Sequence, residues 1–426
     1  MRRRLHGGGY LRLISRGVLV AWSLVHYGCS PGHDPSRGPE VFDSSGITVV
    51  VNPPAMASTM ERWELNPDPI LEVGSEGATG EDGILFQVVG AFMVEGSREV
   101  VVGNKGTSEV LVFDSSGVLA RRIGGYGQGP GELEGLYGLH PCSGGQFMVH
   151  EGRRASVFTL EGDLVWVTPP EWRDMFNFEG ISLDCSSVLF MVPTPPSDLR
   201  PGRVESWDGT FLWGDLVTGE RTELTTFPVF QTLGREVNGV LQWVSFPWWR
   251  RARWVVAGDR VLLATGEKAE VEVWDRRNGL VGVFRWPSPP TAITAADRAQ
   301  NVRVRTTKLA EDPSRAPYIP PSEEIFVPEL KPALWEMLID RSGTLWVQEY
   351  PFWYGGWGFG WANRIGVAPV NWTVLDPAGR AIAAAAVPAD IEILSVHGEN
   401  IVALWRDSLM VEHVRVYRLQ GPGSER

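Results

Sequence analysis

The chain has 426 residues and a formal net charge of −12, from 39 lysines and arginines against 51 aspartates and glutamates. That length is enough for one large closed β architecture or for two ordinary domains. The acidic balance repels phosphate backbones and anionic lipid surfaces, so no nucleic-acid partner is expected.

Residues 1–28 are predicted to be a signal peptide. An arginine-rich opening leads to GVLVAWSLV (17–25), an apolar run too short to span a bilayer. Gly28 and Cys29 resemble the bacterial lipoprotein cleavage site, which makes Cys29 a lipidation candidate; ordinary signal cleavage is the alternative. Residues 29–45 are rich in Pro, Ser and Gly and are typical of a flexible tether. We expect an exported protein, periplasmic or at the cell surface, whose only membrane contact is an outer-membrane lipid anchor at Cys29.

The next segments repeat with a period near 45 residues. VLVFDSSGVLARRIG (110–124) aligns with ASVFTLEGDLVWVTP (155–169), and each reads as strand, glycine turn and strand. A short apolar strand precedes each of them, REVVVGN (98–104) and GQFMVHE (145–151). Together they predict an antiparallel four-stranded unit that occurs about six times, which is the pattern of a β-propeller.

The predicted fold is therefore all-β, a six-bladed β-propeller of four-stranded antiparallel blades over residues 46–420, with 421–426 as a tail. The sixth unit lacks its outer strand, so we expect the N-terminal strand 46–52 to pair with 411–419 and close the ring. The expected blades are 85–123, 132–168, 176–226, 236–287, 325–388, and 391–420 with 46–52.

Two cysteines, Cys142 and Cys185, lie in matching surroundings of successive repeats. In an exported chain they are a disulfide candidate, although the repeat spacing could also hold them too far apart.

The glycine-rich segment GGYGQGPGEL (124–133) follows a strand. A phosphate-binding loop would need a helix after it, and another β unit follows instead, so the glycines are interpreted as a backbone turn. The segment closely resembles the GxGxGPGEF signature of bacterial "6-bladed beta-propeller" proteins, relatives of the NHL and TolB-like propellers, as does DRSGTLWV (340–347). Leu133 replaces the family's Phe, and Gln128 replaces its commoner acidic residue. The resemblance implies a six-bladed propeller outside the cytoplasm and implies no reaction.

One stretch is predicted to be helical. Residues 291–312 lie between blades four and five, and Thr294 with Asp297 has the spacing of a capping box.

Catalytic motifs such as HExxH and CxxC are absent from the sequence. Related six-bladed folds include calcium-dependent lactonases and lyases, which collect oxygen ligands near the central channel. The candidates for such a site are Asn104, Glu151, Glu349 and Asp407, near the ends of second strands; solvated loop charges explain them equally well. This gives the alternative function, a lactonase-like Ca²⁺-dependent hydrolase or lyase; otherwise no cofactor is expected.

The long insertions, 194–207, 227–250, 288–325 and 350–371, are expected on one face of the ring, here called the insertion-bearing face. Two segments there combine aromatic rings with arginine, FPWWRRARW (246–254) and YPFWYGGWGFGWANR (350–364). Such loops bind ligands or form a small core that plugs the channel. The ligand-binding candidates are Trp248, Arg250, Trp353, Trp357 and Trp361. The sequence thus favours a non-enzymatic binding or scaffold module for a peptide, glycan or protein partner.

Overall fold

The computed structural model describes residues 38–74, 83–152, 154–168, 178–198, 200–244, 248–288, 290–311, 313, 327–350 and 369–421. The chain divides into Met1–Arg37 and Gly38–Arg426, and all that follows concerns the described part of the second unit. The lipidation candidate Cys29 lies outside it. Among the described residues, no helix has the length and apolar character needed to cross a membrane.

The first two predicted blades are four-stranded antiparallel sheets. Their middle strands are buried on both faces, which is why they read as nearly continuous apolar runs; all of Val100 to Asn104 is buried. One sheet contains β5 (Val88–Met93), β6 (Val100–Asn104), β7 (Glu109–Phe113) and β8 (Leu119–Gly124); the other contains β9 (Gly138–Pro141), β10 (Gln146–His150), β11 (Ala155–Thr159) and β12 (Leu164–Val167).

The third sheet has five strands and absorbs two of the predicted loops. Most of 227–250 and the ends of 194–207 are strand, because the chain continues its antiparallel pairing beyond the expected blade boundary at residue 226. The strands are β13 (Phe178–Ile181), β14 (Ser187–Thr194), β15 (Val204–Asp215), β16 (Arg221–Val237) and β17 (Val240–Val244).

The fourth sheet has six strands and contains the N-terminal strand that we expected elsewhere. β2 pairs in parallel with β21, not with residues 411–419, so the predicted closure by 46–52 is wrong. The Asn52 side chain holds this position, because its Nδ2 donates to the carbonyls of Arg285 and Gly379 at 2.7 and 2.9 Å. The sheet runs β1 (Glu40–Ser44), β2 (Ile47–Val51), β21 (Gly279–Arg285), β20 (Glu270–Asp275), β19 (Arg260–Ala264) and β18 (Arg253–Ala257).

The predicted fifth and sixth blades are joined in one nine-stranded sheet. β3 pairs in parallel with β25 and antiparallel with β28, and β4 also pairs with β28. The strands are β22 (Glu336–Ile339), β23 (Leu345–Gln348), β24 (Val370–Leu375), β25 (Ala381–Val387), β3 (Glu61–Leu65), β28 (Glu412–Gln420), β27 (Asn400–Arg406), β26 (Ile391–His397) and β4 (Leu71–Val73). The short 3-10 helix η1 (Pro54–Ser58) connects β2 to β3.

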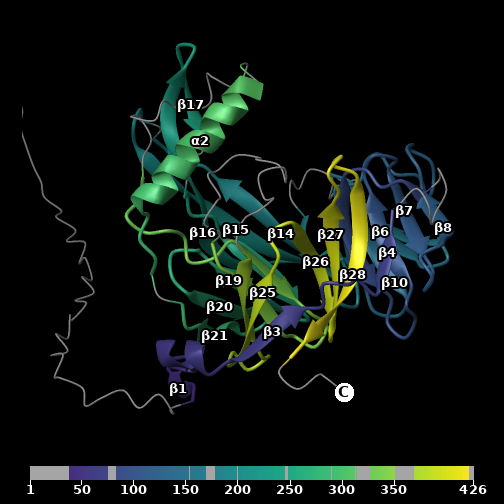
Figure 1. The fold of residues 1–426 in the computed structure, drawn as a ribbon, viewed down its shortest axis with the longest axis horizontal. Helices are drawn as coiled ribbons and strands as arrows, with labels where there is room; N and C mark the ends of the chain where they lie inside the picture. The colour runs from purple at the N-terminus through teal and green to yellow at the C-terminus, as the bar shows by residue number, and fades with distance from the viewer. Residues whose placement is uncertain are drawn as a thin grey trace, which may run out of the picture. The chain divides into compact units, whose positions relative to one another are not determined.

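The described residues therefore form five sheets of four, four, five, six and nine strands, and the expectation of six separate four-stranded blades is wrong. The radial arrangement is nevertheless propeller-like. The innermost strands adjoin one another, β5 with β9 and β26, and β18 with β13 and β22, around a common cavity. In the middle of the nine-stranded sheet, away from these innermost strands, an N-terminal and the C-terminal strand lie side by side, as Figure 1 shows for β3 and β28.

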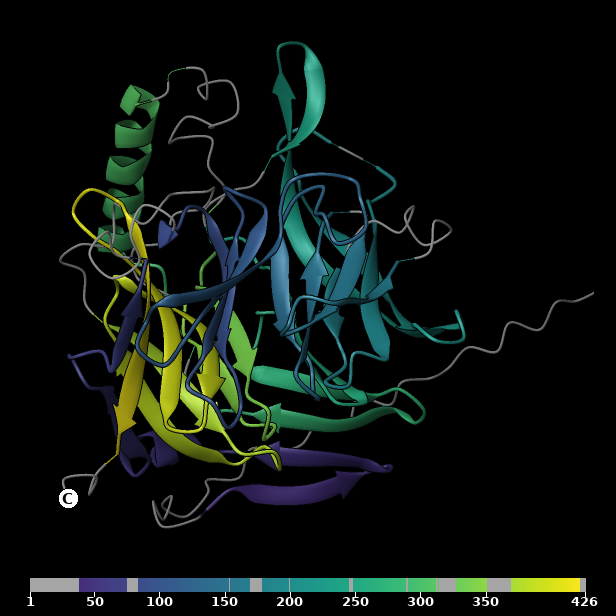
Figure 2. The ribbon, with the colours of Figure 1, turned by 90° about the vertical axis from the view of Figure 1, so that its right-hand side faces the viewer.

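The predicted helix is present as α2 (Ala295–Glu311). Its capping box forms: the Asp297 carboxylate accepts the Thr294 amide at 2.8 Å, and the Asp297 amide donates to the Thr294 hydroxyl at 3.2 Å. The buried carboxylate of Asp297 also pairs with Lys331 at 2.8 Å. In Figures 1 and 2, α2 and the β16–β17 hairpin project toward the same side, opposite β1.

The pairing of β4 with β28 can be tested by its contribution to the free energy of unfolding. Val73 is fully buried and packs against the β28 side chains Val414 and Val416, so Val73→Ala should lower the free energy of unfolding by about 2 kcal/mol. Ile70→Ala, a half-exposed position in the same segment, should change it by less than about 0.5 kcal/mol. Equal effects of the two substitutions in urea denaturation would contradict the assigned packing of β4 on β28.

Candidate functional site: an axial cavity and its two ends

The predicted aromatic binding residues divide into two groups. Trp353, Trp357 and Trp361 lie outside the described residues. Trp248 is 2% exposed and therefore belongs to the protein interior rather than to a surface. Arg250 is at the surface, where its guanidinium pairs with Glu267 at 2.9 Å. Of the described candidates, then, only Arg250 is accessible.

A different set of residues forms an aromatic–arginine cluster, which comprises Trp249, Arg251, Arg253, Trp335 and Tyr350 and surrounds a narrow gap. The Arg253 guanidinium lies 5.3 Å from the centre of the Trp335 ring, a cation–π distance. The rings of Trp335 and Tyr350 meet edge to face at 5.7 Å. The segment FPWWRRARW thus contributes through Trp249 and Arg253, while Trp248, with a φ of 55°, lies in the protein interior.

The innermost strands enclose an axial cavity of about 960 Å³. Each innermost strand contributes an apolar residue to the wall, and charged residues such as Asp259, Asp340 and Glu392 line it as well. The apolar residues are Ala91, Leu139, Ile181, Val256, Leu338 and Ile393. Glu336 connects the cavity to the aromatic–arginine cluster, because it lines the cavity and its carboxylate lies 3.4 Å from the Arg253 guanidinium. The cluster therefore stands at one mouth of the cavity, where β18 and β22 begin.

A neutral histidine faces the cavity. Burial, and then the neighbouring His150, lower the pKa of His140 to about 4. Burial also lowers the pKa of His150, whose Nε2 lies 2.9 Å from the Gly152 carbonyl oxygen. Both rings are thus uncharged near neutral pH, and His140 offers the cavity a hydrogen-bonding group without a charge. Sequence reasoning missed this role, because nothing in the pattern around His140 distinguishes its strand from the others.

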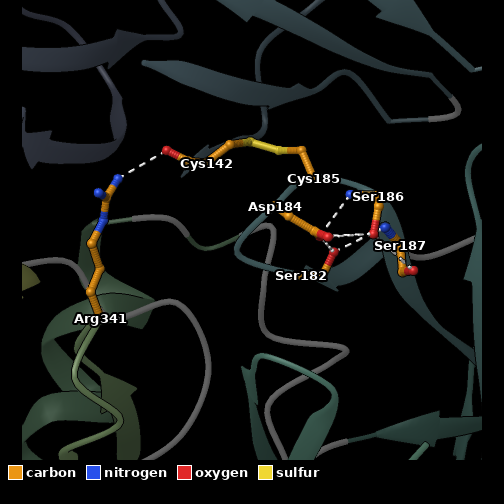
Figure 3. Close-up of a disulfide and its surroundings, with 7 residues drawn as sticks. All are labelled: Cys142, Ser182, Asp184, Cys185, Ser186, Ser187 and Arg341. Carbon is orange, nitrogen blue, oxygen red and sulfur yellow. Dashed lines mark hydrogen bonds between the residues drawn. A yellow bond between two sulfur atoms is a disulfide. The ribbon is translucent and has the colours of Figure 1, made fainter. Parts of the chain in front are cut away.

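The opposite end of the cavity is formed by the short turns between first and second strands. Cys142 in the β9–β10 turn and Cys185 in the β13–β14 turn are joined by a disulfide, with their Cα atoms 5.5 Å apart. Arg341 comes from the β22–β23 turn and donates to the Cys142 carbonyl at 3.0 Å (Figure 3). Its other terminal nitrogen pairs with Glu95 of the β5–β6 turn at 2.6 Å.

The four candidate calcium ligands do not come together. Asn104 accepts the Phe86 amide at 2.7 Å, and Glu151 accepts the Glu134 amide at 2.9 Å while pairing with buried Arg154. Asp407 caps its own turn by accepting the amides of Leu409 and Val411, and Glu349 accepts from Asn371. Among the residues that the structure describes, no three His, Cys, Asp or Glu side chains are placed to share a metal ion.

No family model and no curated protein matches this chain. A solved structure of a DUF4221-family member from Bacteroides vulgatus is similar to it, with 12% identity, coverage of 84% of this chain and 99% of that one, and a TM-score of 0.50. A gluconolactonase from Xanthomonas campestris (10% identity, 79% and 87% coverage) and the calcium-binding protein regucalcin from Agrobacterium tumefaciens (8%, 84% and 96%) have TM-scores of 0.37 and 0.34. The first similarity shows the fold alone, and the other two are too distant to carry an argument.

The contacts of Glu151 predict a structural role that stability measurements can test. Glu151→Ala leaves the buried Arg154 guanidinium without its carboxylate, which should lower the free energy of unfolding by about 3 kcal/mol. Glu349→Ala removes a single hydrogen bond, which is exposed, and should lower the free energy of unfolding by less than about 1 kcal/mol. Similar values for the two variants, both small, would show that Glu151 does not hold its loop.

Proposed function

We propose that the chain is an exported, non-catalytic binding protein that takes the end of a peptide into its axial cavity from the insertion-bearing face. The observation that supports this most is the cavity itself. Its volume of about 960 Å³ lies in the range of ligand sites, and its walls combine apolar strand residues with polar and charged ones such as His140, Glu336 and Arg341.

The sheet edges favour a peptide as the ligand. β5, β9, β13, β18, β22 and β26 each stand at an end of their sheet, so one side of each backbone has no neighbouring strand. Side chains of β26 already bond the Ala91 carbonyl and the Met93 amide of β5. Backbone amides and carbonyls without such a partner could pair with the main chain of a peptide. The aromatic–arginine cluster at the mouth adds rings and cations that suit its side chains.

Export is supported by the disulfide. Cys142 and Cys185 are both buried and form a disulfide, and disulfides persist mainly outside reducing compartments. The leader-like residues 1–28 agree with this assignment, and lipidation at Cys29 would hold the protein at a membrane.

Filling the cavity tests the proposal. Leu338→Trp replaces an aliphatic side chain on the cavity wall by a bulky ring. Leu330→Trp places the same ring at a half-exposed position on the connection leading into β22. Saturation-transfer NMR with an equimolar set of tetrapeptides, and separately with maltotetraose, should show peptide signals with the parent chain and with Leu330→Trp. The Leu338→Trp variant should lose them.

Two outcomes would contradict the proposal. Peptide signals that survive Leu338→Trp would place the site outside the cavity. Signals from maltotetraose alone would assign the cavity to glycans.

A calcium titration addresses the alternative of a lactonase-like hydrolase or lyase. Because Asn104 and Glu151 already accept hydrogen bonds within the fold, we expect neither Ca²⁺ nor a chelator to change the melting temperature. A calcium-dependent rise that Glu151→Gln abolishes would favour the alternative instead.

A further inference from the structure

The end of the cavity opposite the aromatic–arginine cluster is crossed by a single side chain. Arg341 starts in the β22–β23 turn and contacts the β5–β6 and β9–β10 turns, neither of which belongs to its own sheet. It also lines the cavity. The contacts between β18 and β22, β22 and β26, and β26 and β5 place these sheets in order around the axis, so Arg341 reaches over the cavity rather than to a neighbour.

Of its two contacts, the one to Cys142 is the firmer. Glu95 has an 80% exposed side chain, and ion pairs in water contribute little because solvent screens them. The Cys142 carbonyl belongs to a residue that is 1% exposed, so its part-buried hydrogen bond meets less competition from water than the pair with Glu95 does. The anchor of Arg341 is therefore a backbone carbonyl.

The position of that carbonyl is set by the disulfide. Cys142 is bonded to Cys185, and the amide of the next residue, Ser143, donates to the Leu183 carbonyl at 2.6 Å. The β9–β10 and β13–β14 turns are thus held together as one rim (Figure 3). Leu183 lines the same cavity, so the rim borders the space that Arg341 crosses.

We infer that Arg341, anchored on the Cys142 carbonyl by the Cys142–Cys185 disulfide, closes this end of the axial cavity. A ligand that enters from the insertion-bearing face then binds end-on, with its terminus at Arg341. This inference rests on the proposed function for the identity of the site, but the closure itself does not require a ligand.

Access to the cavity measures the closure directly. In a Cys29→Ser background, Leu338→Cys places one free thiol on the cavity wall while the disulfide stays formed. The labelling rate with a maleimide should rise several-fold on adding Arg341→Ala. Arg380→Ala, which removes an exposed arginine from the β24–β25 turn, should leave the rate unchanged.

The anchor is tested by two further variants. Glu95→Gln should leave the labelling rate near that of the parent, because the carbonyl still holds Arg341. Replacing both cysteines by serine, with the reporter thiol kept, should raise the rate as Arg341→Ala does. A fast rate with Glu95→Gln and a slow one without the disulfide would overturn the assigned anchor.

His397 gives a second readout within the folded protein. Burial, and then the charge of Arg341, lower the pKa of His397 to about 4, and its Nε2 accepts the Met93 amide at 3.2 Å. Arg341→Ala should raise this pKa by roughly half a unit or more in an NMR titration. Unchanged labelling together with a raised pKa would show that Arg341 is near His397 without closing the cavity, which overturns the inference. Both readouts are obtained without a peptide, so failure of peptide binding leaves them intact.

Discussion

The arrangement of the sheets depends on the hydrogen bonding of β3 on both of its sides. Its residues Glu61 to Glu64 pair in parallel with β25, and Glu64 and Leu65 pair with the end of β28. A strand with two partners covers the edges of β25 and β28 that face it. Because β3 comes from the N-terminal part and β28 ends the chain, this pairing closes the ring around the axial cavity. The ring of Trp63 packs 5.7 Å from that of Trp346, which lies in β23 of the same sheet.

The strands could be predicted from the sequence much better than their partners could. Alternation and glycine turns locate β6, β7, β10 and β11, since these features are local. The segment 46–52 was also read correctly as a strand, but a short apolar strand fits any unoccupied sheet edge. What directs β2 to β21 is the Asn52 side chain, which also accepts the Ala381 amide at 2.8 Å. A polar contact over such a separation has no signature in a single sequence, so the number and composition of the blades were predicted wrongly.

The same limit applies to the candidate site. Oxygen-bearing residues at the ends of second strands suggest metal ligands, yet Asn104 and Glu151 satisfy amides of the loop that enters their own sheet. Glu412 does the same across two sheets by accepting the Val88 amide at 2.7 Å. Loops that run from the rim of a ring to its axis have amides with no strand partner, and buried acceptors are the means of satisfying them. Recurrence of these residues along the repeats therefore reflects the demands of the fold.

The cavity inherits its asymmetry from the lengths of the turns. First-to-second strand turns are short, so a disulfide and a single arginine can span that end of the axis. The other end receives the longer connections, where Arg253 lies between the Trp335 ring and the Glu336 carboxylate. Because the Arg253 guanidinium stacks on a ring with its flat face and pairs with a carboxylate through its N–H groups, its side chain has little conformational freedom. This fixes the shape of the mouth. A cavity with one rigid mouth and with Arg341 across its other end would select ligands by the chemistry of their terminus, and for this reason we propose that the site binds chain ends rather than chain interiors.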